Sequence, residues 1–338
     1  MKLYELRETK GIDSLIAVER DVPKVWPGQV LIRVHAVSLN YRDLLIVAGR
    51  YMRGLKLPLI PMSDGAGEVV EIGAGVTRVK RGDRVAGIFM PNWLSGEVSP
   101  YTPRTALGGS VDGMLADYVV LSQESVVHIP SHLSYEEAAT LPCAGVTAWN
   151  ALTSWVLKPG ISVLAQGTGG VSIFALQFAK LAGARVIITS SKDKKLERAA
   201  GLGASDLINY ETVPDWDQKA IELTNGIGVD HVVEVGGPGT LARSMNAVRV
   251  GGRISLIGLL SGPESSVNPM PILGKQIQVQ GIFVGSREMF EAMNRAISLH
   301  QLRPVVDRVF AFDEARDALR YCESGAHFGK VVIRVQPA

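Results

Sequence analysis

The sequence contains only two cysteines, Cys143 and Cys322, among 338 residues. Two thiols are too few for a disulfide scaffold or for a structural zinc site built from cysteines, and their scarcity indicates a reducing compartment. The chain has no run of about 18 apolar residues, the length that a membrane-spanning helix needs. Residues 1–20 also lack the uninterrupted apolar segment of a secretory signal peptide. We therefore expect a cytoplasmic protein without a membrane partner.

An excess of charge of one sign is missing as well. The formal net charge is +2, which provides no broad basic surface, and no nucleic-acid partner is expected. Hydrophobic residues make up 46% of the chain, enough for a full core, and the length suits two domains. No internal repeat or low-complexity segment is apparent. This composition is typical of an ordinary soluble enzyme.

The most informative stretch covers residues 158–210. An apolar run at 161–165 enters a glycine-rich turn, a helical segment follows, and a second apolar run covers 185–189, which predicts a βαβ unit. The turn reads Gly167-Thr168-Gly169-Gly170-Val171-Ser172, so Ser172 replaces the third glycine of the dinucleotide fingerprint G-x-G-x-x-G. Glycines let a pyrophosphate approach the backbone, and the helix N-terminus supplies free N–H groups. The alternative is an ordinary glycine-rich turn without a ligand.

The end of the second strand distinguishes NAD from NADP(H). An NAD site places Asp or Glu there for the ribose 2′-hydroxyl, whereas an NADP site removes that charge and supplies hydroxyls and cations for the 2′-phosphate. This chain has Thr189-Ser190-Ser191-Lys192, and the first carboxylate, Asp193, comes beyond the strand end. The sequence therefore favours NADP(H). The basic residues that follow either belong to the phosphate site or form a solvated helix face: Lys192, Lys194, Lys195 and Arg198.

Upstream of this unit, short apolar runs separated by turn residues predict a β-rich module at residues 1–130. Residues 91–109 form an unusually long loop, which is typical of a lid or a binding loop but is equally compatible with a mobile segment. A capping box formed by Ser134 and Glu137 predicts a helix that begins there.

Downstream, strands are predicted at 229–235, 253–260 and 277–285, and their alternation with helices predicts a doubly wound sheet. The last of them ends the strand series, so we expect it at a sheet edge. An unprotected edge invites pairing with a second copy, and we expect a homodimer joined through residues 277–285. A helix is predicted at 286–300, and the final strand, at 329–335, is expected to return to the N-terminal β module.

In this order of parts the chain resembles the medium-chain dehydrogenase/reductase superfamily over nearly its whole length. Four segments are similar to its zinc-independent, quinone-oxidoreductase-like branch: LNYRDLLIVAGRY (39–51), PMSDGAGEVVEIGAGV (61–76), EEAATLPCAGVTAW (136–149) and LINY (207–210). The resemblance implies an α/β fold with a GroES-like β-rich catalytic domain at 1–130, completed by 288–338. A doubly wound Rossmann NADP-binding domain is then expected at 131–287.

The zinc alcohol dehydrogenases of the same superfamily carry a catalytic Cys, a His-Glu pair and a second Cys or an acid. The resemblance places Asn40, Ser63-Asp64 and Cys143 at these positions, and one thiol with one carboxylate does not make a zinc site. The four-cysteine lobe of those enzymes is also missing, its place taken by residues 91–109. We expect no zinc and interpret Cys143 as a core residue.

The same resemblance assigns the binding residues. Beside the turn glycines Gly167, Gly169 and Gly170, the positions that contact the adenosine 2′-phosphate in that branch are Ser190, Ser191, Lys195 and Tyr210. The positions that line the nicotinamide side, for each of which plain core packing is the alternative, are Thr147, Val171, Ile257, Gly258, Phe283 and Val284.

Asn40 and Tyr51 match cleft positions of that branch and are the candidate catalytic residues. Asn can donate to a substrate oxygen, and Tyr can donate a hydrogen bond or a proton. The alternative is that Tyr51 only packs and that Asn40 only holds the nicotinamide ribose. Arg42 and Asp43, between them in sequence, either orient the loop or are solvated. No role is assigned to the six histidines.

These residues together predict a reaction. Without zinc, no Lewis acid stabilises an alkoxide, whereas a quinone or enone takes hydride at a carbon remote from its oxygen and needs only hydrogen-bond donors. We therefore predict an NADPH-dependent reductase of quinones or α,β-unsaturated carbonyls. The rivals are an NADP-dependent alcohol or aldehyde dehydrogenase and a non-catalytic NADPH-binding protein.

Overall fold

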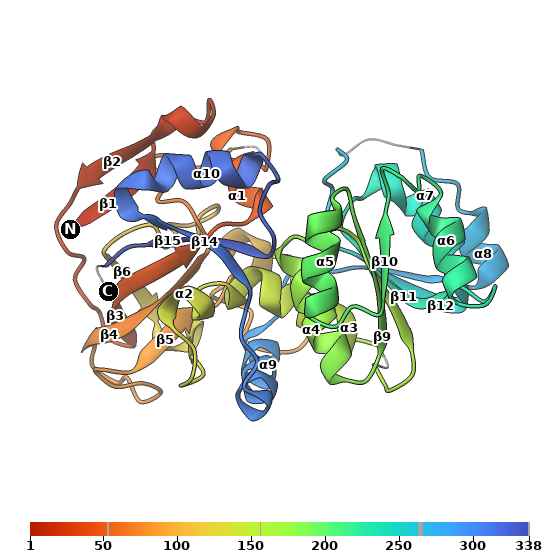
Figure 1. Ribbon diagram of the computed structural model, residues 1–338. Helices are drawn as coiled ribbons and strands as arrows, with labels where there is room; N and C mark the ends of the chain where they lie inside the picture. Colours follow the sequence, from red (N-terminus) through yellow and green to blue (C-terminus); the bar gives the residue numbers. More distant parts are fainter. Residues whose placement is uncertain (53, 156, 263–265, 337–338) are drawn as a thin grey trace. The chain divides into compact units, whose positions relative to one another are not determined.

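The structure is a computed structural model that describes residues 1–52, 54–155, 157–262 and 266–336. The chain forms two compact units (Figure 1). The first consists of Met1–Val146 and Val284–Ala338, and the second of Thr147–Phe283. The sequence predicted other boundaries. It placed residues 131–146 and 284–287 in the Rossmann domain, whereas the structure places them in the first unit.

The contacts of these two segments explain the difference. Arg84 Nη2 donates to the carbonyl of Leu133 at 2.6 Å, and the backbone N–H of Cys143 donates to Asp64 Oδ2 at 3.1 Å. The backbone N–H of Arg287 donates to the carbonyl of Trp93 at 2.9 Å. Both segments are thus bonded to the β-rich part of the chain. Sequence periodicity does not reveal such partners.

The first unit is β-rich, as predicted. Its strands are β1 (Lys2–Leu6), β2 (Leu15–Glu19), β3 (Gln29–Ser38), β4 (Asp64–Ile72), β5 (Arg84–Gly87), β6 (Tyr118–Ser122), β7 (Val126–His128), β14 (Val306–Ala311) and β15 (Lys330–Arg334). Its helices are α1 (Tyr41–Val47), α2 (Tyr135–Ala138), α9 (Arg287–His300) and α10 (Ala315–Glu323). Helix α3 (Val146–Thr153) starts at the unit boundary.

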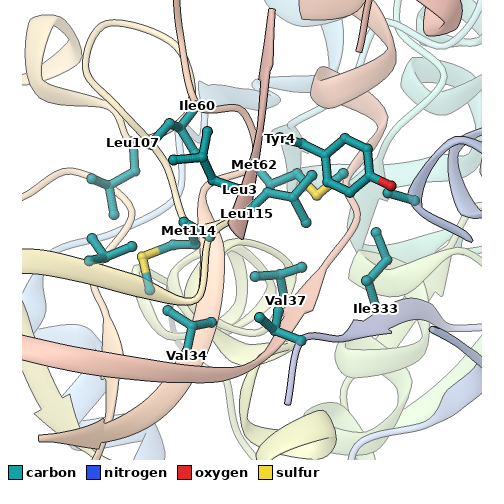
Figure 2. Packing of buried hydrophobic residues seen from close by; sticks show 14 of the residues in the cluster. Leu3, Tyr4, Val34, Val37, Ile60, Met62, Leu107, Met114, Leu115 and Ile333 are labelled. Atoms are coloured by element: carbon teal, nitrogen blue, oxygen red, sulfur yellow. The ribbon is translucent and has the colours of Figure 1, made fainter. Parts of the chain in front are cut away.

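Seven strands of this unit form one sheet in the order β14-β15-β3-β4-β5-β7, with β6 paired to β3. Strand β15 runs antiparallel to β3, with Ile333 opposite Val37, so the predicted return of the final strand is confirmed. Strands β1 and β2 form a separate antiparallel pair. Figure 2 shows the apolar core, in which Val34 and Val37 of β3 meet Ile333 and residues from distant loops such as Met62 and Leu107.

Two helix starts follow their sequence signals. Ser134 Oγ accepts from the N–H of Glu137, whose carboxylate in turn accepts from the N–H of Ser134, so the capping box is confirmed. Helix α9 begins after Ser286, whose hydroxyl accepts from the N–H of Met289 at 3.2 Å. Helix α1 is an exception inside the predicted β module, and it carries the candidate catalytic segment.

The second unit is a doubly wound parallel sheet, as predicted. Its strands are β8 (Ser162–Ala165), β9 (Arg185–Ser190), β10 (Asp206–Asn209), β11 (Val229–Glu234), β12 (Val248–Leu256) and β13 (Gln278–Gly281). Its helices are α4 (Gly170–Leu181), α5 (Asp193–Gly201), α6 (Trp216–Leu223), α7 (Pro238–Ala247) and α8 (Met270–Lys275). All neighbouring strands are parallel, in the order β10-β9-β8-β11-β12-β13. This is the Rossmann order, in which ligands bind at the carboxyl ends of the strands.

Strand β13 lies at the edge of this sheet, which confirms the predicted position of the last apolar run. The strand is shorter than residues 277–285, because regular pairing with β12 ends at Gly281. The N–H of Ile282 still donates to the carbonyl of Leu256 at 2.9 Å. Helix α5 packs on β9 and β10 at the other end of the sheet (Figure 1).

Among the described residues, no helix is both long and apolar enough to cross a membrane. The cytoplasmic location stays a prediction from the sequence.

One histidine is locked into the second sheet. His231 of β11 is 0% exposed, its Nε2 shares a hydrogen bond with Ser255 Oγ at 2.9 Å, and its ring stands edge-on to Trp155. Burial, assisted by the nearby positive charge of Arg253, lowers the pKa of His231 from 6.5 to about 3. The native state therefore keeps this imidazole neutral.

This burial predicts a loss of stability in mild acid. Below pH 6.5 the unfolded chain binds a proton at His231 that the native state does not bind, so the free energy of unfolding falls as the pH drops toward 3. Between pH 7.5 and pH 5.0 the loss from this group is about 2 kcal/mol. Urea unfolding at both pH values should show that the free energy of unfolding of His231→Gln falls by about 2 kcal/mol less between them than that of the parent protein. The exposed His300, changed to Gln, is the control; an equal effect of both substitutions would contradict the assignment.

Candidate functional site

The glycine-rich turn of the second unit leaves room for a ligand. Gly167 has φ +69°, and a Cβ added at Gly169 would meet nothing within 4 Å, so packing within the protein does not demand glycine at residue 169. At Gly258 the reason for glycine is different, because a Cβ there would lie 2.2 Å from the carbonyl of Val235. The open space beside Gly169 fits the close approach of a pyrophosphate.

Helix α4 begins directly after Gly169, and its first N–H groups have no intrahelical acceptors. They and the positive end of the helix dipole suit a phosphate anion. Ser172, in place of the third glycine, is buried and donates its hydroxyl to the carbonyl of Gln166 at 2.5 Å. Serine therefore fits between helix and strand because its one polar atom is satisfied inside the turn.

A buried polar network that the sequence did not reveal supports this turn. Glu234, the last residue of β11, is 0% exposed, and its Oε2 accepts from Gln166 Nε2 at 2.7 Å and from the hydroxyl of Ser244. Its Oε1 accepts from the N–H groups of Gly236 and Gly237 at 2.8 and 2.9 Å and from Thr240 Oγ1 at 2.6 Å.

This network joins the two loops at the topological switch point of the sheet. Gln166 follows β8, Glu234 ends β11, and β8 and β11 are the neighbours between which the strand order reverses. Gln166 Oε1 also accepts from the N–H groups of Val235 and Gly236. A fully satisfied buried network of this kind holds both loops in one arrangement before any ligand arrives.

The end of β9 lacks a carboxylate, as the sequence indicated. Ser190 is only 3% exposed, and its hydroxyl accepts from the N–H of Lys192 at 3.4 Å. The N–H of Tyr210, after β10, donates to the carbonyl of Ser190 at 3.1 Å, which brings these two predicted residues together. Asp193, the first acid, accepts from Asn209 Nδ2 at 2.7 Å and is thereby held by the end of β10.

The structure brings most predicted cofactor residues to one edge of the second sheet. At the carboxyl ends of its parallel strands lie Gly167, Gly169, Gly170 and Val171 after β8, Ser190, Ser191 and Lys195 at and after β9, Tyr210 after β10, Ile257 and Gly258 after β12, and Phe283 after β13. Thr147 is buried in α3 and belongs to the same unit. Val284 belongs to the first unit. This β-branched residue has φ +57°, a strained conformation that occurs preferentially at functional positions.

In the first unit, Asn40 is held by Asp43 and Lys330. Its backbone N–H donates to Asp43 Oδ2 at 2.8 Å, and its side-chain Oδ1 accepts from Lys330 Nζ at 2.6 Å. The same ammonium group donates to the carbonyl of Leu39. Because Lys330 occupies the amide oxygen, Nδ2 is the side-chain donor of Asn40, and the carboxylate of Asp64 lies beside it. The catalytic role of Asn40 stays a prediction.

Two carboxylates are buried beside this lysine. Burial raises the pKa of Asp43 to about 6, although Arg42 and the N–H of Asn40 favour its charged form. Burial also raises the pKa of Asp64, and Lys330 is the strongest opposing charge. Lys330 itself is 3% exposed. The ammonium group thus compensates negative charge inside the core.

Arg42 is buried rather than solvated, which decides between the two alternatives for it. The side chain is 8% exposed, and its Nη1 donates to the carbonyl of Leu107 at 2.8 Å. The guanidinium carbon lies 4.9 Å from the ring centroid of Tyr51 and 4.6 Å from that of Phe89. Arg42 therefore connects the candidate residue Tyr51 to the loop at 107.

Tyr51 stays a hydrogen-bond donor at neutral pH. Burial raises the pKa of its phenol, and Arg42 only partly opposes this effect. The protonated hydroxyl is the form that can donate to a substrate oxygen.

The loop at 91–109 is anchored at its end. The N–H of Leu107 donates to the carbonyl of Phe89 at 3.0 Å, and a Cβ at Gly108 would lie 2.5 Å from backbone atoms of Met62. Met62, with φ +68°, directly precedes Ser63 and Asp64. The end of the loop therefore packs on the turn that carries the acid, whereas Val98 and Tyr101 are exposed.

The residues at the zinc-ligand positions do not fit a zinc ion. Asp64 accepts from Ser63 Oγ with one oxygen and from the N–H of Cys143 with the other. Burial raises the pKa of the Cys143 thiol, so the thiolate that binds zinc is disfavoured. Within the described ranges, no group of three or more His, Cys, Asp or Glu side chains could hold a metal ion. Cys143 lies in a π-helical turn at Leu141–Gly145 and is half-buried, rather than fully enclosed in the core as the sequence had led us to expect.

Comparison with known proteins is consistent with this two-unit architecture. The alcohol dehydrogenase GroES-like domain family matches residues 26–131, and the zinc-binding dehydrogenase family matches residues 170–298. A zinc-type alcohol dehydrogenase-like protein of Schizosaccharomyces pombe is 46% identical over 336 residues, which cover 97% of each chain.

Two solved structures extend the comparison. A Sinorhizobium meliloti 1021 protein called an alcohol dehydrogenase shares 42% identity, with a TM-score of 0.91 and 99% of each chain covered. The quinone oxidoreductase of Coxiella burnetii shares 28% identity, with a TM-score of 0.80 and 99% of each chain covered.

A single charge at the end of β9 should test the choice of cofactor. In Ser190→Asp the new carboxylate repels a 2′-phosphate, so we expect the affinity for NADPH to fall about 100-fold while the affinity for NADH changes less than about threefold. Fluorescence titration with both dinucleotides measures this. Ser298→Asp, on the exposed face of α9, is the charge control. In Gly169→Val the side chain fills the open space, and both dinucleotides should be lost. Unchanged NADPH affinity in Ser190→Asp would contradict the assignment.

Proposed function

Because this chain belongs to the medium-chain dehydrogenase/reductase superfamily, we propose that it is an NADP(H)-dependent oxidoreductase that reduces quinones or α,β-unsaturated carbonyls without a metal ion. The main support is the chemistry of the residues at the positions that bind zinc in the zinc-dependent members of this superfamily. They hold Asn40, Asp64 and Cys143, whose available oxygens already accept hydrogen bonds and whose thiol is protonated.

The cofactor part of the proposal rests on the second unit. The turn at Gly167–Gly170 and the start of α4 would hold the pyrophosphate, and Ser190, Ser191 and Lys195 would hold the 2′-phosphate. When bound, NADPH supplies the acceptor with a hydride, that is, a proton with two electrons. The network around Glu234 keeps the receiving loops in place.

The substrate class follows from which charges the first unit can stabilise. Reduction of a simple carbonyl places a full alkoxide charge on one oxygen, and zinc enzymes stabilise it with a Lewis acid. Conjugate reduction instead gives an enolate or a hydroquinone anion, whose charge is spread and needs only hydrogen-bond donors. Tyr51 and Asn40 offer such donors. The quinone oxidoreductase of C. burnetii, with a similar fold, supports this reading.

We also propose that the protein is a homodimer joined along β13. One side of this edge strand lacks a neighbouring strand within the described sheet. Large apolar side chains are exposed close to it in sequence: Leu259, Leu260, Met270, Leu273 and Phe283. An apolar surface next to an open strand edge is suited to a second copy of the same chain.

The reaction is tested by following NADPH consumption by EDTA-treated protein. We expect turnover with benzoquinones and simple enones, no turnover with saturated aldehydes, and no effect of the chelator. Metal analysis of untreated protein should find well under one zinc per chain, because only one thiol and one carboxylate are available. Turnover with aldehydes alone, lost on chelation, would instead establish a zinc-dependent alcohol or aldehyde dehydrogenase.

The dimer is tested by light scattering at micromolar concentration. Leu273→Asp, at a side chain that is 75% exposed on α8, should convert a dimer into a monomer, because it buries a charge in the apolar contact. Leu299→Asp is the matched control, since Leu299 is 78% exposed on α9 of the first unit. A monomeric parent protein would refute the proposal.

A further inference from the structure

Arg42 carries more hydrogen-bonding capacity than the protein uses. Its side chain is 8% exposed, yet Nε and Nη2 have no hydrogen-bond partner among the described residues. Nη1 donates to the carbonyl of Leu107, and Asp43 Oδ1 lies 3.9 Å from that same nitrogen, beyond hydrogen-bond range. The phenol of Tyr51 also interacts with the guanidinium group. Buried donors of a charged group are costly to leave unpaired, so these two require an explanation.

The two unpaired atoms form one edge of the guanidinium group. Arg185 shows what this edge does elsewhere in the same chain: its Nε and Nη2 hold the two carboxylate oxygens of Asp206 at 2.8 and 3.0 Å. In Arg42 the equivalent edge is in place but holds no protein acceptor within the described structure. It is therefore a buried two-donor fork without a protein acceptor in the part of the chain that the structure describes, which an oxygen ligand would satisfy.

The surroundings hold this fork in one position. The guanidinium carbon lies over the rings of Tyr51 and Phe89, and the bond to Leu107 holds its opposite edge, so the plane of the group is set. Gly109 lets its own backbone pack closely against Nη2. A Cβ at this residue would lie 2.5 Å from Nη2, although Gly109 has no left-handed backbone that demands glycine.

We propose that the Nε–Nη2 edge of Arg42, beside Tyr51, binds the carbonyl oxygen of the conjugated acceptor and stabilises the negative charge that this oxygen gains. The inference rests on the proposed function and extends it to a further catalytic residue. When the β-carbon of an enone gains hydride from NADPH, a new C–H bond forms, the C=C electron pair moves toward the carbonyl and the oxygen becomes an enolate. NADPH is oxidised to NADP⁺, and a proton from water or Tyr51 completes the product.

Arg42 suits this step because its charge is permanent. A fixed cation that donates two hydrogen bonds stabilises an oxygen more as negative charge develops on it, which lowers the barrier rather than only tightening binding. The Nε–Nη2 edge is therefore suited to the charge that forms during reduction.

The activity arm of the test compares three variants with the parent protein. Arg42→Met should lower kcat/KM for 2-cyclohexenone about 100- to 1,000-fold, and Arg42→Lys should recover part of the loss, because it keeps the charge without the fork. Gly109→Ala should also lower kcat/KM, since its methyl group would lie 2.5 Å from Nη2 and displace the guanidinium group. The affinity for NADPH should stay within about twofold in each, because the dinucleotide turn lies in the second unit. Arg104→Met, which removes an exposed guanidinium that stacks on Tyr101, is the control.

A spectroscopic arm does not depend on turnover. 4-Nitrophenol carries an ionisable oxygen like that of a hydroquinone, and its phenolate absorbs visible light. Bound to the parent protein, it should ionise at a pH at least about one unit lower than when it is bound to Arg42→Met. This readout would not change if Arg42 only supported the loop at 107. Ionisation of the bound phenol at its solution pH, or no binding, would overturn the proposal, even if Arg42→Met did not fold.

Different outcomes would refute the proposed function and the role of Arg42. A parent protein that turns over no quinone or enone refutes the proposed function, whereas the phenol titration still tests the fork. Enone turnover that survives Arg42→Met within about threefold refutes the role of Arg42 and leaves the function intact. If propionate binds in competition with enones and 4-nitrophenolate does not, the fork serves a carboxylate, which also overturns the proposal.

Discussion

The buried ammonium group of Lys330 is the contact on which the candidate site of the first unit depends. It donates to the carbonyl of Leu39 and to the side chain of Asn40, residues that lie about 290 positions earlier in the chain. It also opposes the charges of Asp43 and Asp64. Without it, two carboxylates would remain in the core with much less compensation, which is among the most destabilising changes a buried site can undergo.

The second unit uses a buried charge in a similar way but with the sign reversed. There the carboxylate of Glu234 is surrounded by donors from Gln166, Ser244, Thr240 and two backbone amides. In both units a fully buried ion fixes loop backbone that packing alone would leave variable. Such networks cost desolvation energy, but they fix the loop geometry before the ligand binds.

The sequence was most informative where a pattern is local. The strand, turn and helix at 161–181 and the capping box at Ser134 depend on neighbours within a few residues, and each was located correctly. The edge position of β13 and the return of β15 followed from the order of the strands. The extent of the units did not, because the segments at 131–146 and 284–287 are assigned by hydrogen bonds to distant residues.

The same limit applies to the candidate site. The glycine turn and the missing acid at Ser190 are visible in the sequence because dinucleotide binding needs particular residue types at fixed spacing. Arg42, Glu234 and Lys330 sit in ordinary contexts, and nothing local separates a buried charged residue from a solvated one. The only sequence signal for Lys330 is a charge within an apolar run, between Gly329 and three β-branched residues. The two units also differ in continuity: the second is one stretch, whereas the first needs both Met1–Val146 and Val284–Ala338. During translation the Rossmann unit therefore leaves the ribosome complete while the first unit still lacks β15, and Asn40 gains its lysine only after the whole second unit has been made.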